Sequence, residues 1–459
     1  MVLMNTQKAY FHVLLLPLAV VGCTSGEKSK VCNPARIASP ALTTHRVTWN
    51  DWAAVEQTNG IMTLRHVPAV GGRTLSLEIN GDDAFLVVDE HRGQTYDADS
   101  LENSVHFGGH FVCIGPELRW SVDEQPFNTN AGPYDVQVES SDASQHTILL
   151  TSRHASWRGA TISMQRSITM HRGSTHVAIE EQVINRGDKP LEVYLWDFTQ
   201  LDAHRDDPKN GKTRRNLVVY MPVPLGENGE KQYTSLLPPD SAMEAQIDEG
   251  SAASMLRLNY QGVPFKVASH PEAWWVAAVD RDTGWTYVKQ FEASEDPTYV
   301  DNNGPVEVFG SGEDHPLGMF VELELLTGMN RYAPGEGIVQ RANWYATTCA
   351  GPVLSVKPAG VVCSPLRAYR DDGHDGDEEW EVRGRFGVFH LGTAQLVAYD
   401  QSNEPVASVE TFDIDPREEL IIKVDIDDDR LLDKRLKLQI FDHNGDPVGT
   451  LEETFLSYE

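Results

Sequence analysis

The most regular feature of the chain is an alternation of apolar and polar residues with a period of two. The segments "RTLSLEI" at 73–79, "ATISMQRSITMH" at 160–171 and "LEVYLWDF" at 191–198 all follow it, and this period is typical of strands with one buried face. Short polar segments such as "NGDD" and "NRGDKP" separate the strands and are rich in turn residues. The pattern predicts an all-β protein built on a large antiparallel β-sandwich.

A second group of strands follows a boundary near residue 350. "EWEVRGRFGVFHL" and "RLKLQIFDHNGDPVGTLEETF" alternate in the same way within a segment of about 100 residues, the size of an immunoglobulin-like sandwich. We therefore expect the large sandwich at 45–350, a linker at 351–377 and a small immunoglobulin-like β-sandwich at 378–459. The polar segment 202–252 is expected to form long loops on the large sandwich, where binding residues often lie.

The first 23 residues predict export. Lys8 precedes an apolar run from Val13 to Val21, which has the length of a signal-peptide core and is too short to span a bilayer. The run ends in Val20-Val21-Gly22-Cys23 and so resembles a bacterial lipoprotein box. Residues 1–22 are then a signal peptide, Cys23 carries the lipid, and 23–44 form a tether. Thr24 favours the outer membrane of the cell envelope over retention in the inner membrane. An ordinary secretory signal is the alternative.

The net charge indicates which partners to expect, and the cysteine content indicates which disulfides and metal sites to expect. The 459 residues carry a formal net charge of −30, which repels phosphate backbones and excludes nucleic acid as an expected partner. Export permits disulfides, and Cys349 and Cys363 are the expected pair because they are close in sequence at the domain boundary. Whether Cys32 and Cys113 pair stays open. No cysteine spacing of a zinc knuckle occurs, so no structural metal is expected.

The segment "HFGGHFVCIGPELRW" at 106–120 combines glycines with polar side chains. His106 and His110 are four residues apart, but the two glycines between them disfavour the helix on which such a pair would share a face. Glycines allow a backbone to approach a ligand closely. We expect either a loop at the rim of a cleft, with His110, Glu117 and Arg119 as binding residues, or a turn whose polar groups cap the backbone.

The larger unit resembles the aldose 1-epimerase (galactose mutarotase)-like superfamily, in a branch of uncharacterised bacterial lipoproteins. Four segments at 64–87, 107–117, 166–198 and 320–346 carry the resemblance, the first with its Gly-Gly-Arg turn and the last with "FVELELL" and a "PGE" turn. The resemblance implies a β-supersandwich. It implies no cofactor.

The resemblance also implies candidate catalytic residues. Mutarotases use a carboxylate as general base and a histidine as general acid across the sugar ring. Glu322 matches the position of the base, and Glu324 shares its face of the strand. The position of the family's histidine is Trp196 here, which cannot transfer a proton but can stack on a sugar ring. Asp197 is expected on the opposite face of that strand.

Three functions remain open from the sequence. The first is a lipid-anchored envelope protein that binds a sugar or glycan through Arg73, His110, Trp196 and Glu322, without catalysis. The second is a sugar epimerase, or another carbohydrate-active enzyme, with Glu322 as base and an acid from elsewhere. The third is a structural envelope protein that binds other proteins. The sequence specifies neither the sugar nor the oligomeric state.

Overall fold

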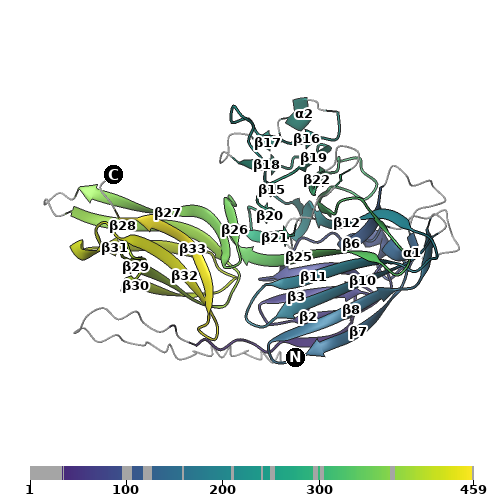
Figure 1. Cartoon of the computed structure of the whole chain (residues 1–459), viewed down its shortest axis with the longest axis horizontal. Coiled ribbons are helices and arrows are strands. Elements are labelled where there is room, and N and C mark those ends of the chain that lie inside the picture. The colour runs from purple at the N-terminus through teal and green to yellow at the C-terminus, as the bar shows by residue number, and fades with distance from the viewer. Residues whose placement is uncertain are drawn as a thin grey trace, which may run out of the picture.

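The computed structural model of the chain describes residues 34, 36–95, 106–116, 127–157, 160–207, 211–238, 241–244, 246–248, 254–292, 298–299, 304–372 and 378–456. Within these ranges the regular secondary structure is almost entirely strand, as predicted (Figure 1). The short helical segments are α1 (Phe127–Asn130), α2 (Ser241–Glu244) and two 3-10 turns at Asp89–His91 and Asp429–Leu431.

The larger unit contains two large antiparallel sheets. The first has 12 described strands, in the order β1 (Thr43–Trp49), β2 (Trp52–Thr58), β3 (Met62–Val67), β4 (Arg73–Ile79), β6 (His110–Gly115), β12 (Leu191–Asp202), β23 (Phe320–Leu326), β22 (Val306–Gly310), β19 (Phe265–Ser269) and β16 (Thr234–Ser235), with β5 (Asp82–Asp83) beside β4 and β24 (Asn330–Tyr332) beside β12.

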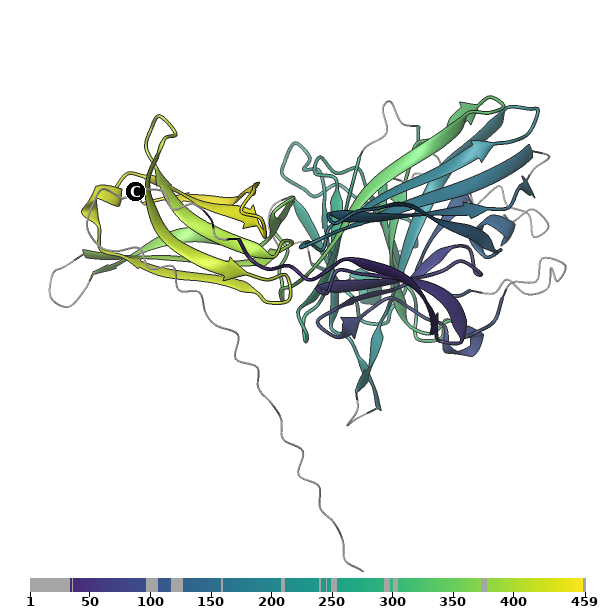
Figure 2. The same ribbon diagram turned by 90° about the horizontal axis from the view of Figure 1, so that it is seen from below.

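The second sheet has 11 described strands, in the order β17 (Ile247–Asp248), β18 (Met255–Asn259), β15 (Leu217–Pro222), β20 (Trp275–Asp280), β21 (Trp285–Phe291), β25 (Gly337–Thr348), β11 (Val177–Asn185), β10 (Ala160–His171), β8 (Gln145–Ser152) and β7 (Tyr134–Ser141), with β9 (Ala155–Trp157) beside β10. Figure 2 shows the purple strands of the first sheet and the blue strands of the second as two stacked layers.

The alternation seen in the sequence decides which side chains lie between the two layers. Leu195 and Leu323 of the first sheet pack in one apolar core with Ile168 and Trp344 of the second, which stabilises the sandwich because apolar surface is removed from water on both sheets. We call this side of the first sheet its inner face, and the opposite side its outer face.

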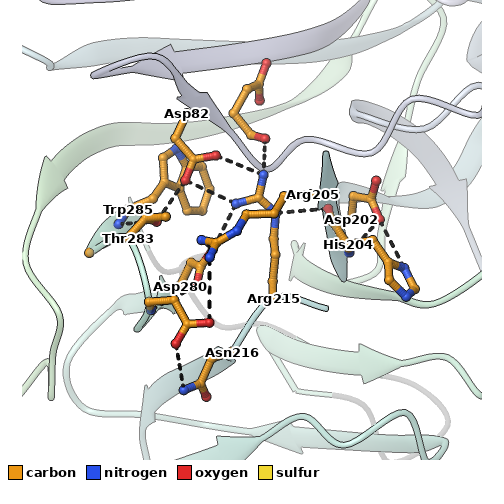
Figure 3. A network of polar contacts seen from close by, with 12 residues as sticks. Asp82, Asp202, His204, Arg205, Arg215, Asn216, Asp280, Thr283 and Trp285 are labelled. Carbon is orange, nitrogen blue, oxygen red and sulfur yellow. Dashed lines mark hydrogen bonds and ion pairs between the residues drawn. The ribbon is translucent and has the colours of Figure 1, made fainter. Parts of the chain in front are cut away.

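Segment 202–252 is not a set of loops alone, which corrects the prediction. Strand β15 lies inside the second sheet, and β13 (His204–Asp207) pairs with β14 (Gly211–Arg214) in a separate hairpin. Next to this hairpin, the buried Arg215 forms ion pairs with Asp82 of β5 at 2.9 Å and with Asp280 of β20 at 3.0 Å (Figure 3). Because β5 and β20 belong to different sheets, Arg215 links the two layers.

The smaller unit is a sandwich of two four-stranded antiparallel sheets with its own apolar core. One sheet has the order β26 (Ser355–Lys357), β27 (Gly360–Asp372), β28 (Glu378–Val388) and β31 (Leu420–Ile426), and the other has the order β30 (Pro405–Ile414), β29 (Gly392–Tyr399), β32 (Arg435–Asp442) and β33 (Pro447–Phe455). The predicted linker 351–377 is therefore wrong over 355–372, whose residues pair into this sandwich.

The two units contact each other directly. The backbone N–H of Thr175 donates to Phe389 O at 2.9 Å, and that of Thr348 donates to Pro416 O at 2.8 Å. One apolar cluster contains Tyr345 from the larger unit and Phe389 from the smaller. Cys349 and Cys363 form a disulfide beside this contact.

Candidate functional site on the outer face

Strands β6, β12, β23, β22 and β19 place a polar and aromatic cluster on the outer face of the first sheet. In the register of these strands Phe198 is opposite both Phe111 and Glu324, and Glu324 is in turn opposite Glu307. Residues two apart in a strand share a face, so Trp196 and Glu322 also belong to the cluster. We define the outer-face cluster as Arg73, Phe111, Trp196, Phe198, Gln200, Lys266, Glu307, Glu322 and Glu324.

Glu324 is the centre of a hydrogen-bond network. Its Oε2 accepts from Trp196 Nε1 at 2.8 Å and from Lys266 Nζ at 3.1 Å. Lys266 Nζ also lies 3.0 Å from Glu307 Oε2 and 4.7 Å from the centre of the Trp196 ring. One ammonium group therefore serves two carboxyl groups and one indole, and the side chains of these three partners are buried.

The two carboxyl groups share a single cation, so one of them holds a proton. Burial and the adjacent Glu324 carboxylate raise the pKa of Glu307 to about 8, against the opposing effect of Lys266. Burial by itself lowers the pKa of Lys266, but Glu324 and Glu307 outweigh it and the pKa is raised. Two carboxyl groups in contact cannot both ionise at low cost. Around pH 7 the pair therefore carries one acidic proton.

Glu322 occupies a less buried part of the cluster. Its Oε1 accepts from Gln200 Nε2 at 2.7 Å, and the Arg73 guanidinium is close enough to interact with its charge. Arg73 itself is buried, donates to Gly108 O at 2.8 Å and stacks 3.8 Å from the centre of the Phe111 ring. Arg73 thus supplies positive charge to the site while its N–H groups bind backbone oxygens.

Aromatic rings form the floor beside these charges. Phe111 and Phe198 stack with centroids 4.9 Å apart, and Trp196 packs against Phe198 at 4.6 Å. All three rings are buried, with relative exposures of 6% for Phe111, 3% for Trp196 and 8% for Phe198, so a ligand with one apolar face and several hydroxyl groups would contact them at their edges.

The sequence grouped Arg73, Trp196 and Glu322 with His110 in one cleft and placed Glu324 on the face of Glu322. The structure brings Arg73, Trp196, Glu322 and Glu324 together on the outer face, without His110. The sequence grouping did not include Lys266, Glu307 or Gln200. The sequence does mark two of these residues as candidates for a site. Lys266 and Glu307 are charged residues inside the otherwise apolar strand segments "FKVAS" and "VEVFG". Asp197 lies on the inner face, as predicted.

The expected position of His110 at the rim of a cleft is wrong. His110 is the first residue of β6, fully buried, and lies on the inner face opposite Thr199. Arg166 donates to its Nδ1, so the neutral ring carries its proton on Nε2, 3.1 Å from Asp197 Oδ2. Burial and nearby Arg166 lower the pKa of His110 to about 3. The residue joins the layers of the sandwich and is not available to a ligand on the outer face.

His110 belongs to a buried ionic network that spans both sheets. Asp197 pairs with Lys289 of β21, and Arg166 of β10 pairs with Glu181 of β11 at 3.0 Å. His110, Glu181 and Asp197 come close enough together to ligate a cation. However, Lys289 and Arg166 already neutralise the two carboxylates, so a metal ion would add uncompensated positive charge to a buried site. We assign the network to the stability of the sandwich.

Several predicted residues lie outside the described ranges. Glu117, Arg119, Cys23 and Cys32 belong to this group. Cys113 is described, is buried against the aromatic rings of the outer-face cluster, and accepts from Asn130 Nδ2 at 3.2 Å. Among the described residues no helix is long and apolar enough to cross a membrane.

Comparison with known proteins shows a likeness in fold. No protein-family model and no curated protein matches the chain. Similar solved structures include a proposed aldose 1-epimerase from Klebsiella pneumoniae, 12% identical, with a TM-score of 0.46 over 64% of this chain and 79% of that one.

A galactose mutarotase-like protein from Clostridium acetobutylicum is 9% identical, with a TM-score of 0.43 over 67% of this chain and 99% of that one. A galactose mutarotase-like protein from Lactobacillus casei is also 9% identical, with a TM-score of 0.41 over 64% and 99%. At these identities the likeness describes the β-sandwich architecture of the larger unit and leaves the function to be argued from its side chains.

Proposed function

We propose that the larger unit binds a sugar or a sugar residue of a glycan at the outer-face cluster. The observation that supports this most is the contact of aromatic rings with a hydrogen-bonding acid: Trp196 packs against Phe198 at an interplanar angle of 35° and donates to Glu324. The apolar face of a pyranose packs on aromatic rings, and its hydroxyl groups donate to carboxylates. Glu322 and Lys266 are the partly exposed polar groups through which a ligand would be held.

Catalysis of anomer interconversion is the second candidate function. A general base and a general acid must act on opposite sides of the reacting ring. Glu322 is the candidate base. The proton shared by Glu307 and Glu324 offers an acid in place of the histidine, since burial and the adjacent Glu324 carboxylate raise the pKa of Glu307 to about 8. Glu322 and Glu324 are two residues apart, about 7 Å along the strand, which leaves room for part of a ring between them.

The proposal includes export and anchoring. The run from Val13 to Val21 followed by Gly22-Cys23 supports cleavage before Cys23 and lipid attachment to its sulfur. The protein would then display the sugar site at the cell envelope, on a short tether at the outer membrane. A Cys23→Ser variant that still partitions into membranes would contradict this part of the proposal.

The test uses soluble protein starting at Thr24 and a panel of freshly dissolved aldoses and uronic acids. NMR follows anomer interconversion and, in the same samples, saturation transfer from protein to sugar. The matched variants are Glu322→Gln in the cluster and Glu180→Gln, an exposed glutamate of β11 on the second sheet.

Three outcomes separate the functions. Saturation transfer without faster interconversion, reduced by Glu322→Gln and unchanged by Glu180→Gln, supports a binding protein. Faster interconversion that Glu322→Gln abolishes supports the epimerase. Absence of both signals with every sugar contradicts both and favours a structural protein that binds other proteins.

A further inference from the structure

Four histidines gather at the junction of the two units, outside the outer-face cluster. His171 and His176 flank the turn between β10 and β11, whereas His390 precedes β29 and His443 follows β32 in the smaller unit. They line one cavity of about 440 Å³ together with Asp442. The hairpin of β10 and β11 brings His171 and His176 together, and the contact between the two units adds His390 and His443.

Stacked rings connect the histidines across the junction. His171 stacks on His176 with centroids 4.6 Å apart, His176 stacks on Tyr345 at 5.0 Å, and Tyr345 stacks on Phe389 at 4.3 Å. His390 follows Phe389 directly and forms a β-bridge with Ser174. The histidines of the larger unit are therefore held next to His390 by continuous contacts.

Two of the rings make, at Nε2, the kind of hydrogen bond that metal-binding imidazoles commonly make at their other nitrogen. The Nε2 of His390 lies 3.1 Å from Pro358 O, and the Nε2 of His176 lies 2.7 Å from Asn343 Oδ1. Each contact fixes the ring proton on Nε2 and leaves the Nδ1 lone pair available. Ligating histidines commonly donate their other N–H to a carbonyl or amide oxygen in this way, which fixes both tautomer and orientation.

The other two rings each have a buried nitrogen without a partner. His171 Nε2 and His443 Nδ1 lie out of contact with solvent and make no hydrogen bond within the part of the chain described. A buried polar atom without a partner is costly. Gly173 is the residue that allows His443 to come so close, because a Cβ at this position would lie 2.3 Å from His443 Nδ1.

The charge state of the cavity suits a cation ligand set. Burial, with a smaller effect of neighbouring histidines, lowers the pKa of His171 to about 4, and burial lowers the pKa of His390 to about 4 as well. Neutral rings are the form that binds metals. Asp442 adds a negative charge, and the one basic side chain among the described lining residues, Arg172, donates to Ser39 O and Pro40 O.

We propose that His171, His176, His390 and His443 form a binding site for a divalent transition metal of the zinc type, and that the bound ion fastens the two units together. Imidazole nitrogen favours zinc, copper and nickel over magnesium and calcium, which prefer oxygen. No three ligand nitrogens of these four described histidines lie within 4.8 Å of one another, and His171 stacks on His176, so binding requires His171 and His443 to rotate toward the ion. His171 Nε2 and His443 Nδ1 make no hydrogen bond within the described part of the chain, so rotation of these two rings breaks none at those atoms.

The segment before β1 already crosses the same junction. The backbone N–H of Ile37 donates to His443 O at 2.9 Å, and Arg172 of the larger unit donates to Ser39 O at 2.7 Å. Two residues that line the cavity, Arg172 and His443, therefore contact this segment, and an ion bound in the cavity would hold the two units beside it.

The test is a calorimetric titration of Zn²⁺, with Ca²⁺ as the comparison ion, into the chain that starts at Thr24. A Cys32→Ser background is used because a thiol would also bind Zn²⁺. We expect one Zn²⁺ per chain, no Ca²⁺ binding, and at least tenfold weaker Zn²⁺ binding in His171→Gln and in His443→Gln. His45→Gln, which changes an exposed histidine of β1, should bind as the background does.

A second measurement guards against variants that fail to fold. Zn²⁺ should raise the melting temperature of the background protein and have little effect on that of His443→Gln, a change in the turn between β32 and β33. Zinc-edge anomalous diffraction should place the ion between His171 and His443. Absence of stoichiometric Zn²⁺ binding, unchanged affinity in both variants, or an ion located elsewhere would each overturn the proposal.

Discussion

Trp196 donates its indole N–H to Glu324 over 2.8 Å. The indole of Trp196 is thus bonded directly to a buried acid. The tryptophan cannot transfer a proton, but it fixes the Glu324 carboxyl group and adds an apolar surface beside it. The proton proposed to act as the acid is the one that the carboxyl pair of Glu307 and Glu324 shares.

Trp196→Phe should weaken sugar binding by roughly tenfold. The substitution removes one of the two donors to Glu324 Oε2 and leaves Lys266 as the other; a hydrogen bond to a charged group contributes about 1.5–3 kcal/mol. The ring area that contacts Phe198 is largely kept, so the fold should persist. Saturation-transfer titration measures the affinity, and Trp49→Phe in β1 serves as the control. Equal affinity in Trp196→Phe and the unmodified protein would contradict a role for the indole.

Glu307→Gln should change how stability depends on pH. A glutamate in the unfolded chain ionises near 4.5, whereas burial and Glu324 raise the pKa of Glu307 to about 8. Between these pH values the folded protein holds a proton that the unfolded chain releases, so this group makes the protein less stable as pH rises from 4.5 to 8. The glutamine of the variant cannot ionise, and the variant should therefore lack this part of the slope.

Urea denaturation at several pH values measures the difference. The free energy of unfolding of the unmodified protein, minus that of Glu307→Gln, should fall steadily across this range. The exposed Glu180→Gln variant should run parallel to the unmodified protein. Parallel curves for Glu307→Gln would show that the carboxyl pair does not share a proton.

Lys289→Met should destabilise the larger unit by about 3–5 kcal/mol, because removal of one partner leaves the buried Asp197 without its main counter-charge. The double variant Lys289→Met, Asp197→Leu restores the balance and should be more stable than the single one. Denaturant titration of both, beside the exposed Lys423→Met, measures the effect. A single variant as stable as Lys423→Met would contradict a stabilising network.

Removal of the disulfide by Cys349→Ser with Cys363→Ser should lower the free energy of unfolding by about 3 kcal/mol, the value expected for a closed loop of this order of length. The two residues are 14 apart in sequence and lie where the units meet. Denaturant titration with and without reductant measures the loss. Reductant should destabilise the unmodified protein and leave the double variant unchanged; an effect on both would point to another cause.

The sequence determined the β character of the chain and the division of each strand into two faces. Alternation with period two is a local property, so it correctly separated Trp196 from Asp197 and grouped Glu322 with Glu324. It also marked the second sandwich, although the start of that sandwich was missed: residues 355–372 contain short or irregular strand patterns with two register shifts.

Only the tertiary structure decided which face of a strand is inner and which strands are neighbours. His110 follows two glycines, and this local pattern indicates a loop. In the structure His110 belongs to a strand that pairs with β4 and β12, and its side chain contacts Arg166 and Asp197. Lys266 and Glu307 reach Glu324 through the strand order of the first sheet. The histidines at 171, 176, 390 and 443 meet because two separate sandwiches are in contact. Such groupings depend on sheet order and domain packing, which no local pattern of residues encodes.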